Sequence, residues 1–262
     1  MNALSVLFYH IGNFSEAELL LRSVIEIREK ILDANDPLIA KAWSDLGVIF
    51  YSQGKLDEAE KYLLNALERY QSFYKNNHSE TASTLGNLGA IHYFRKKYDS
   101  AIDYYNKSIA MYEHIYGANH ITLFPLMGNL AMAYMGIHDY EKAKPLFLRT
   151  VTLNKSVYGN FHSEVAVAFM NLGVFYSRRK DYEEASEMLH QALEIYKRLF
   201  GEEHYATINT YISFGMNLYR NGKLDEGRKL IEKYLPLLKE KLGSNHQMYK
   251  ISEAKWDELI KG

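Results

Sequence analysis

Hydrophobic residues recur at steps of three and four along most of the chain. Between residues 98 and 112 they stand at Tyr98, Ala101, Ile102, Tyr105, Ile109 and Tyr112. This spacing places them on one face of an α-helix of about residues 98–115. A first helix of about residues 79–94 precedes it, and the second stops near Gly117, where a residue without a Cβ can end a helix in the left-handed conformation. The pattern therefore predicts a pair of helices joined by a tight turn.

The same pattern returns every 42 residues. Four sets of positions share this period: small residues at Ala17, Ala59, Ala101, Ala143, Ala185 and Gly227; large apolar residues at Leu4, Leu46, Leu88, Leu130, Leu172 and Phe214; a small residue directly after each of these; and turns at Gly12, Gly54, Lys96, His138, Lys180 and Gly222. We expect repeats at about residues 1–33 (partial), 34–75, 76–117, 118–159, 160–201 and 202–243. Residues 244–262 then form a C-terminal capping helix, and we expect Glu253, Lys255, Asp257 and Glu258 on its polar outer side.

A single helix pair of this kind cannot bury its hydrophobic stripe, so successive pairs must stack on one another. We therefore expect an all-α fold, a right-handed superhelical solenoid of stacked antiparallel helix pairs that forms one domain over residues 1–262. The alanine and glycine positions allow the two helices of a pair to approach closely. Pro236 falls late in a predicted helix, and we expect it to kink or fray that helix.

The repeated positions resemble the tetratricopeptide repeat. The resemblance rests on the Leu-Gly pairs, a following aromatic residue such as Tyr134 or Tyr176, and an aromatic and an alanine after the turn, as in Tyr98 and Ala101. The usual unit has 34 residues, whereas the 42-residue unit, with segments such as Gly201 to His204, resembles kinesin light chain and its relatives. The resemblance spans essentially the whole chain. It implies a solenoid that binds other proteins, although such repeats serve many unrelated systems.

Five histidines also follow the period, at His78, His120, His162, His204 and His246. The ligands of one metal ion must converge within about 2 Å of it, whereas a 42-residue step moves each histidine along the stack. We interpret them as residues that cap or pack the entry of each first helix. The sequence predicts neither a metal site nor another cofactor.

In solenoids of this family the first helix of each pair lines the concave face, which usually binds the ligand. Directly before the large apolar positions lies a column of polar residues, called here the ladder column: Asp45, Asn87, Asn129, Asn171 and Ser213. The three asparagines resemble the asparagine ladder of long tetratricopeptide superhelices, in which amides hold a peptide backbone. An amide offers both a donor and an acceptor to an extended peptide. The alternative is that each asparagine bonds the neighbouring helix.

Apolar residues of the same helices give a second set of candidates, namely Met132, Met170, Met216 and Tyr219. Thioether side chains repack around varied partners, which suits a groove for apolar peptide residues. The alternative is that several of them fill the core between helices. The Lys and Asn pair of the clamp that grips chaperone C-termini is missing from the matching positions, so a chaperone-tail adaptor is not expected.

Two arginines, Arg178 and Arg220, recur one period apart at the ends of first helices. Their guanidinium groups could receive an acidic motif in bidentate fashion. The alternative is that they are solvated turn charges neutralised by nearby carboxylates. The carboxylates in question are Asp181, Glu183, Asp225 and Glu226.

Composition narrows the class of protein further. The 31 Lys+Arg and 32 Asp+Glu give a formal charge of −1, which offers no electrostatic reason to expect nucleic acid or an anionic membrane as a partner. The absence of cysteine excludes thiol chemistry and suits a reducing compartment. The longest nearly apolar stretch, Val165 to Tyr176, is shorter than the roughly 18–20 residues that cross a bilayer. We therefore expect a cytoplasmic protein without membrane insertion.

The motifs of catalysis are missing as well. The sequence has no phosphate-binding glycine loop, His-Glu-x-x-His pair, calcium loop or nucleophile elbow. We expect a non-catalytic adaptor or scaffold whose concave groove binds a peptide or helical segment of a partner protein. Two alternatives stay open: a structural or self-associating module, such as a homo-oligomer, and a peptide-sensing regulatory domain of a larger protein.

Overall fold

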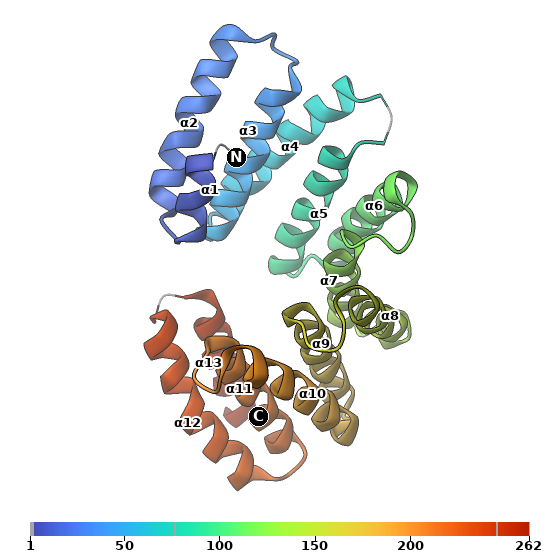
Figure 1. Ribbon diagram of the computed structural model, residues 1–262, viewed down its shortest axis with the longest axis vertical. Helices are drawn as coiled ribbons and strands as arrows, with labels where there is room; N and C mark the ends of the chain where they lie inside the picture. Colours follow the sequence, from blue (N-terminus) through green and yellow to red (C-terminus); the bar gives the residue numbers. More distant parts are fainter. Residues whose placement is uncertain (1–2, 76, 245, 262) are drawn as a thin grey trace. The chain divides into compact units, whose positions relative to one another are not determined.

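The protein is all-α throughout the residues described by the computed structural model, which are 3–75, 77–244 and 246–261 (Figure 1). The helices are α1 (Ala3–His10), α2 (Phe14–Ile31), α3 (Pro37–Ser52), α4 (Leu56–Phe73), α5 (Ser79–Phe94), α6 (Tyr98–Tyr116), α7 (Leu123–Gly136), α8 (Tyr140–Tyr158), α9 (Ser163–Arg179), α10 (Tyr182–Phe200), α11 (Tyr205–Arg220), α12 (Leu224–Leu242) and α13 (Gln247–Lys261). The predicted fold class is confirmed. Among these helices, none combines the length and the apolar character needed to span a membrane.

The chain forms two compact units, residues 1–139 with α1–α7 and residues 140–262 with α8–α13. Within each unit, helices that follow one another along the chain pack together, and so do alternate odd-numbered helices: α3 with α5, α5 with α7, α9 with α11 and α11 with α13. The odd-numbered helices are the predicted first helices, and their outer surface in each unit is called here the first-helix face. The boundary between the units falls within the predicted 118–159 repeat, and a single domain over the whole chain stays a prediction.

The predicted turns adopt the left-handed conformation. At the turn positions, φ is 75° at Gly12, 77° at Gly54 and 82° at Gly222. The other repeats place a residue with a Cβ there, and Lys96, His138 and Lys180 still have φ between 58° and 71°. A side chain in this conformation costs roughly 1–2 kcal/mol, so packing of the flanking helices holds these three turns.

The periodic histidines cap the first helices, as predicted. In His78, His162, His204 and His246 the ring Nδ1 accepts a hydrogen bond from the backbone N–H two residues later, at 3.2–3.3 Å. His120 receives the corresponding bond from Thr122 at 3.4 Å. An aromatic residue four positions earlier packs against the ring in four of the repeats, with Tyr74 stacked on His78 at a centroid distance of 3.4 Å. The histidine therefore satisfies a free N–H and joins the preceding helix to the next one.

The small residues let the helices of a pair meet closely. The five alanines of the period are fully buried. A Cβ added to Gly47 would lie 2.7 Å from Leu63, and one added to Gly89 would lie 2.8 Å from the ring of Tyr105. The predicted close approach is confirmed in these pairs. α12 continues past Pro236 to Leu242, so the expected fraying at this residue is wrong, and the alternative of a kink stays a prediction.

Substitution of Gly89 tests the close approach. Gly89→Ala forces the new methyl group into the Tyr105 ring, and overpacking of this kind costs about 1–3 kcal/mol. Gly128→Ala is the matched control, because no atom lies within 4 Å of its Cβ position in the middle of α7. Alanine loses less conformational freedom than glycine when a helix forms, so Gly128→Ala should raise the free energy of unfolding by about 0.5–1 kcal/mol. Urea unfolding measures both values, and equal effects of the two substitutions would contradict the packing described here.

Buried tyrosines predict the response to alkaline pH. Burial raises the pKa of Tyr51 to about 12 and that of Tyr196 to about 12, and it also raises the pKa of Tyr70 and of Tyr105. An unfolded tyrosine ionises near pH 10, so the unfolded state loses protons first. The stability contributed by these groups is complete below about pH 10 and is lost as pH rises through about 12.

We expect the urea midpoint to fall steeply between about pH 10 and 12, with phenolate absorbance at 295 nm rising together with the loss of helical circular dichroism. The urea midpoint of the double variant Tyr51→Phe/Tyr196→Phe should decline less steeply with pH, because phenylalanine has no hydroxyl group that can ionise. A midpoint independent of pH in this range would contradict the burial of these phenols.

Candidate functional site

The three ladder asparagines lie on the first-helix faces of the two units. Asn87 is on α5 and Asn129 on α7 in the first unit, and Asn171 is on α9 in the second. Asn87 and Asn171 are half-buried, and Asn129 is exposed. None of the three side chains forms a hydrogen bond with a described residue of its own unit. The fold of each unit therefore does not use their donors and acceptors.

Asparagines with a structural role look different. Asn217 is fully buried, and its amide donates to the backbone oxygen of Tyr182 and to Ser186 Oγ, both at 2.9 Å. The buried Asn154 donates to the backbone oxygen of Thr150 at 2.9 Å. The sequence analysis did not single out these two residues, since each occurs once rather than in a periodic column. The contrast argues against the interpretation in which the ladder asparagines bond neighbouring helices.

The apolar candidates divide between surface and core. Met132 and Met170 are half-buried on α7 and α9. Met216 is only 5% exposed and packs with Ile212 and Ile231 in the core of the second unit. Its assignment to the groove lining is wrong, because position 216 faces the second helix of its own pair. We leave it out of the candidate site.

Met170 borders a cavity of about 400 Å³ in the second unit. The cavity lies between the start of α9, the end of α10, the start of α11 and α13, and its lining includes Val167, Phe200, Asn209 and Met248. The Met170 sulfur lies 3.8 Å from Asn209 Nδ2. Ser163, Glu164 and His204 also border the cavity, so its lining combines polar groups with the apolar side chains of Val167, Met170, Phe200 and Met248. The apolar part suits an apolar side chain of a ligand.

The capping helix α13 packs against α11 and α12 of the second unit. Its Trp256 ring meets Tyr219 of α11 edge-on at a centroid distance of 5.1 Å, and Ser252 Oγ donates to Asn209 Oδ1 at 3.2 Å. Tyr219 is therefore partly covered by the protein itself. A ligand could contact only the exposed edge of the pair formed by Tyr219 and Trp256.

The two candidate arginines are not neutralised by the carboxylates expected to do so. Asp181 pairs with Arg179 at 3.1 Å, and Glu183 accepts from Asn221 at 3.2 Å. Arg178 is exposed, whereas Arg220 is half-buried with its Nη1 3.5 Å from Ser177 Oγ. Neither arginine forms an ion pair within the described part of the chain.

A third cation joins these arginines. Lys255 of α13 is half-buried, and Arg178 and Arg220 are close enough for their charges to act on its ammonium group. The sequence analysis treated α13 as a polar cap with Lys255 on the outside, which is wrong. The signal was present, because residue 255 follows Ser213 by 42 residues and so continues the ladder column.

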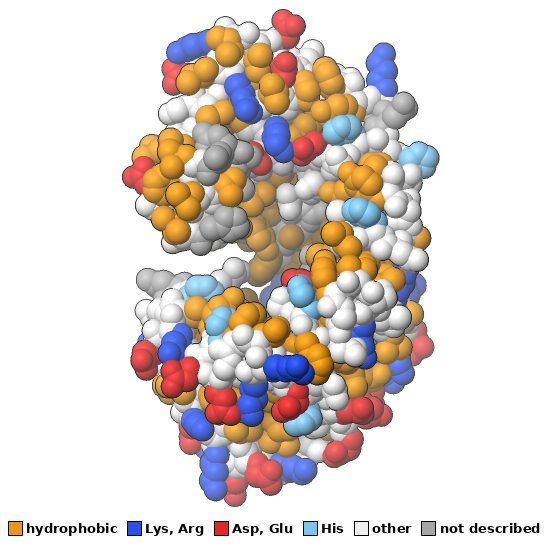
Figure 2. Space-filling model, in the orientation of Figure 1, with side chains coloured by type: hydrophobic (Ala, Val, Ile, Leu, Met, Phe, Trp, Pro, Cys, Tyr) orange, Lys and Arg blue, Asp and Glu red, His pale blue; other side chains and the backbone are white. Residues whose placement is uncertain are grey.

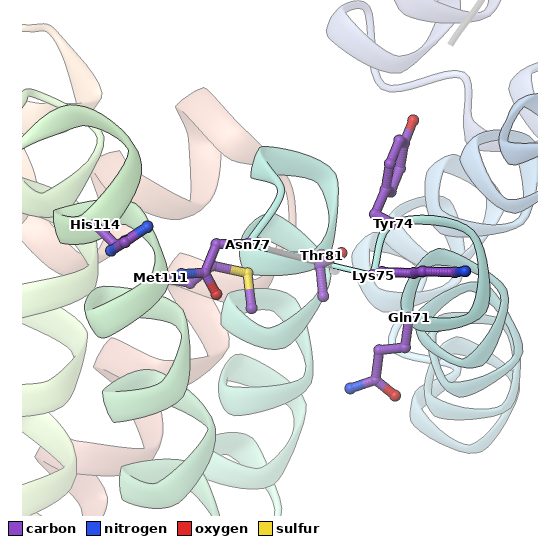
Figure 3. Close-up of a pocket in the computed structure, with 7 residues that line it drawn as sticks. All are labelled: Gln71, Tyr74, Lys75, Asn77, Thr81, Met111 and His114. Carbon is purple, nitrogen blue, oxygen red and sulfur yellow. The ribbon is translucent and has the colours of Figure 1, made fainter.

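The first unit has a cavity of its own, of about 630 Å³, near the ends of α4 and α6 (Figure 3). Its polar side chains do not converge: Figure 3 shows the Lys75 side chain extending away from His114. Thr81 Oγ1 is buried at its wall and has no hydrogen-bond partner among residues 3–75, 77–244 and 246–261. The described residues contain no group of His, Asp and Glu side chains arranged to hold a metal ion.

Exposed hydrophobic side chains gather over α1 and α2, as Figure 2 shows. They include Leu4, Leu7, Ile11 and Leu19, each at least 49% exposed. The leucine position of the first repeat is thus exposed at Leu4, whereas its equivalents Leu46 and Leu88 are fully buried. This patch is a second surface on which another protein could dock.

Comparison with known proteins places this geometry in a family. A model of the tetratricopeptide repeat matches residues 38–114, 122–189 and 164–240, and another model of the same repeat matches residues 1–38. No curated protein matches the sequence. Together the family models account for most of the chain.

Several solved structures share the fold. BtubC (BKLC) from P. vanneervenii gives a TM-score of 0.67 at 18% identity, over 87% of this chain and 89% of that one. A kinesin light chain-like protein of Podospora anserina with nearly identical TPR-like repeats gives 0.64 at 17% identity, over 80% and 99%. NprR in complex with its cognate peptide NprX gives 0.68 at 15% identity, over 95% and 67%. At this identity the likeness shows the fold, and the repeat matches show that the chain belongs to the tetratricopeptide-repeat family.

Proposed function

We propose that the chain is a non-catalytic adaptor or scaffold of the cytoplasm whose first-helix face binds an extended peptide segment of a partner protein. Asn87 and Asn129 in the first unit, and Asn171 in the second, would hydrogen-bond the backbone of a peptide bound to that unit. The observation that carries the proposal is that these three side chains are accessible and unbonded within their own units, whereas the buried Asn154 and Asn217 are bonded.

The chemistry of an amide suits this role. A peptide in an extended conformation presents an N–H and a C=O at regular intervals, and one asparagine can accept from the first and donate to the second. Such contacts ignore the side chains of the peptide. Discrimination among peptides must then come from neighbouring residues, such as Met132 and the cavity beside Met170.

The structural neighbours support a ligand of this class. NprR was solved with its cognate peptide, and a Rap protein of the same fold was solved with the Competence and Sporulation Factor. Both have TM-scores of at least 0.66 with this chain. The near-neutral charge gives no reason to prefer nucleic acid over a protein ligand.

Self-association is the second candidate function. The hydrophobic patch over α1 and α2 supports it, because exposed apolar surfaces of this kind commonly mark protein interfaces. In this case a second copy of the chain, rather than a peptide, would be the partner. A molar mass that rises with protein concentration would favour this candidate.

A peptide-display selection tests the first candidate. We expect a consensus peptide to bind the parent and to bind the triple variant Asn87→Ala/Asn129→Ala/Asn171→Ala at least tenfold more weakly, about 1.4 kcal/mol. Exposed asparagines away from this face provide the control, as Asn106→Ala/Asn160→Ala. Circular dichroism checks that helicity is kept.

Equal binding by parent and triple variant would move the site elsewhere. Failure to enrich any peptide, together with a mass that rises with concentration, would favour self-association.

A further inference from the structure

The first-helix face of the second unit carries three cations close together. Arg178 on α9, Arg220 on α11 and Lys255 on α13 come from three first helices that pack one after another (Figure 1). Arg220 Nη1 lies 3.5 Å from Oγ of Ser177, the residue before Arg178. Tyr219 and Trp256, the residues next to Arg220 and Lys255, have their rings in contact at a centroid distance of 5.1 Å. Arg220 and Lys255 are half-buried. Like charges in a partly buried site repel one another, so this arrangement lowers stability unless an anion compensates it.

The described residues do not supply that anion. The carboxylate of Glu258 acts on Arg220 without forming an ion pair, and the turn acids Asp181 and Glu183 bond other residues. The negative ends of α9 and α11 favour cations in the last helical turn, where Arg178 and Arg220 lie. Lys255 lies in the middle of α13, where the helix offers no such compensation.

The electrostatics of Lys255 agree with this geometry. Burial lowers the pKa of its ammonium group, and the charges of Arg178 and Arg220 lower it further. Burial and the charge of Arg178 also lower the pKa of Arg220. The first unit provides a contrast, because the cation on its first-helix face, Lys41, pairs with Glu80 at 2.8 Å.

We propose that Arg178, Arg220 and Lys255 bind a doubly charged anionic group of the peptide held on the first-helix face of the second unit. A phosphoryl monoester or two neighbouring carboxylates would supply this group. Three cations without a partner match a dianion better than a single carboxylate, and guanidinium groups bind such oxyanions in bidentate fashion. The inference rests on the proposed function, since the anion is carried by the peptide.

The cavity beside Met170 sets the spacing within the peptide. Met248 at the cavity and Lys255 at the cation cluster are seven residues apart on α13, which places them on one face of the helix about 10 Å apart. Asn209 and Arg220 are eleven residues apart on α11, about 16 Å. An extended peptide rises about 3.3 Å per residue. The ligand would therefore carry an apolar residue and a dianionic group about three to five residues apart.

Peptide arrays with this spacing test the proposal. Each random peptide carries a leucine and, three to five residues later, phosphoserine, a Glu-Glu pair or unmodified serine. We expect phosphoserine or Glu-Glu peptides to bind the parent at least tenfold more tightly than their serine counterparts, and the tighter of the two identifies the source of the charge. The variant Arg178→Gln/Arg220→Gln/Lys255→Gln should lose this preference.

A matched variant controls for net charge. Arg228, Lys229 and Lys250 are exposed cations of the same unit, so Arg228→Gln/Lys229→Gln/Lys250→Gln removes the same charge and should keep the preference. Because repulsion is relieved, Lys255→Gln alone should leave the melting temperature unchanged or raise it. A lowered melting temperature would show that Lys255 has a stabilising partner, and this would overturn the proposal.

The remaining outcomes separate the inference from the proposed function. If serine peptides bind as tightly as dianionic ones and depend on the ladder asparagines, the proposed function stands and the cation site is refuted. If no peptide binds, both fail as stated. The melting temperature would then be compared in sodium phosphate and in sodium chloride at equal ionic strength. If phosphate raises it for the parent but not for Arg178→Gln/Arg220→Gln/Lys255→Gln, the three cations bind a free anion instead of a peptide.

Discussion

The close contact between the two helices of each pair is the constraint on which the rest of the structure depends. Fully buried alanines and the glycines opposite them leave no room for another carbon, as the 2.7 Å approach to Leu63 at Gly47 shows. This contact fixes which face of each helix is buried. The opposite face of each first helix is thereby turned outward with the same residue positions in each repeat. Within each unit, a polar residue repeated every 42 positions therefore lies on the first-helix face of that unit.

The sequence was sufficient to predict the features that recur. The helix pairs, the turns and the histidine caps all appear several times, and each occurrence supports the others. Lys96, His138 and Lys180 illustrate the strength of this signal, since only the period identifies them as turns equivalent to Gly12 and Gly54. Their left-handed conformation is a finding of the structure. The helix-breaking tendency of Pro236 was a weaker guide, because packing against neighbouring helices keeps α12 intact.

Features that occur once were harder to predict. Met216 lies on a first helix, as the groove candidates Met132 and Met170 do, yet it is buried, and only the packing of α12 decides this. Lys255 lies on α13, a first helix that no second helix follows among the described residues. Its pattern of apolar and polar residues therefore predicted a capping helix with a polar outer side. Lys255 approaches Arg178 and Arg220 because of the way α13 packs on α11. The contacts of Trp256 with Tyr219 and of Ser252 with Asn209 determine this packing. Neither result follows from periodicity.

The central claim is that ligands bind on the first-helix face rather than on the second helices of the pairs. Hydrogen–deuterium exchange of the parent with and without a selected peptide tests it most directly, because exchange reports protection along the whole backbone. The account predicts added protection in first helices, namely α5 and α7 or α9 and α11, with α4, α6 and α10 unchanged. Protection confined to α1 and α2, or to the second helices of the pairs, would contradict it.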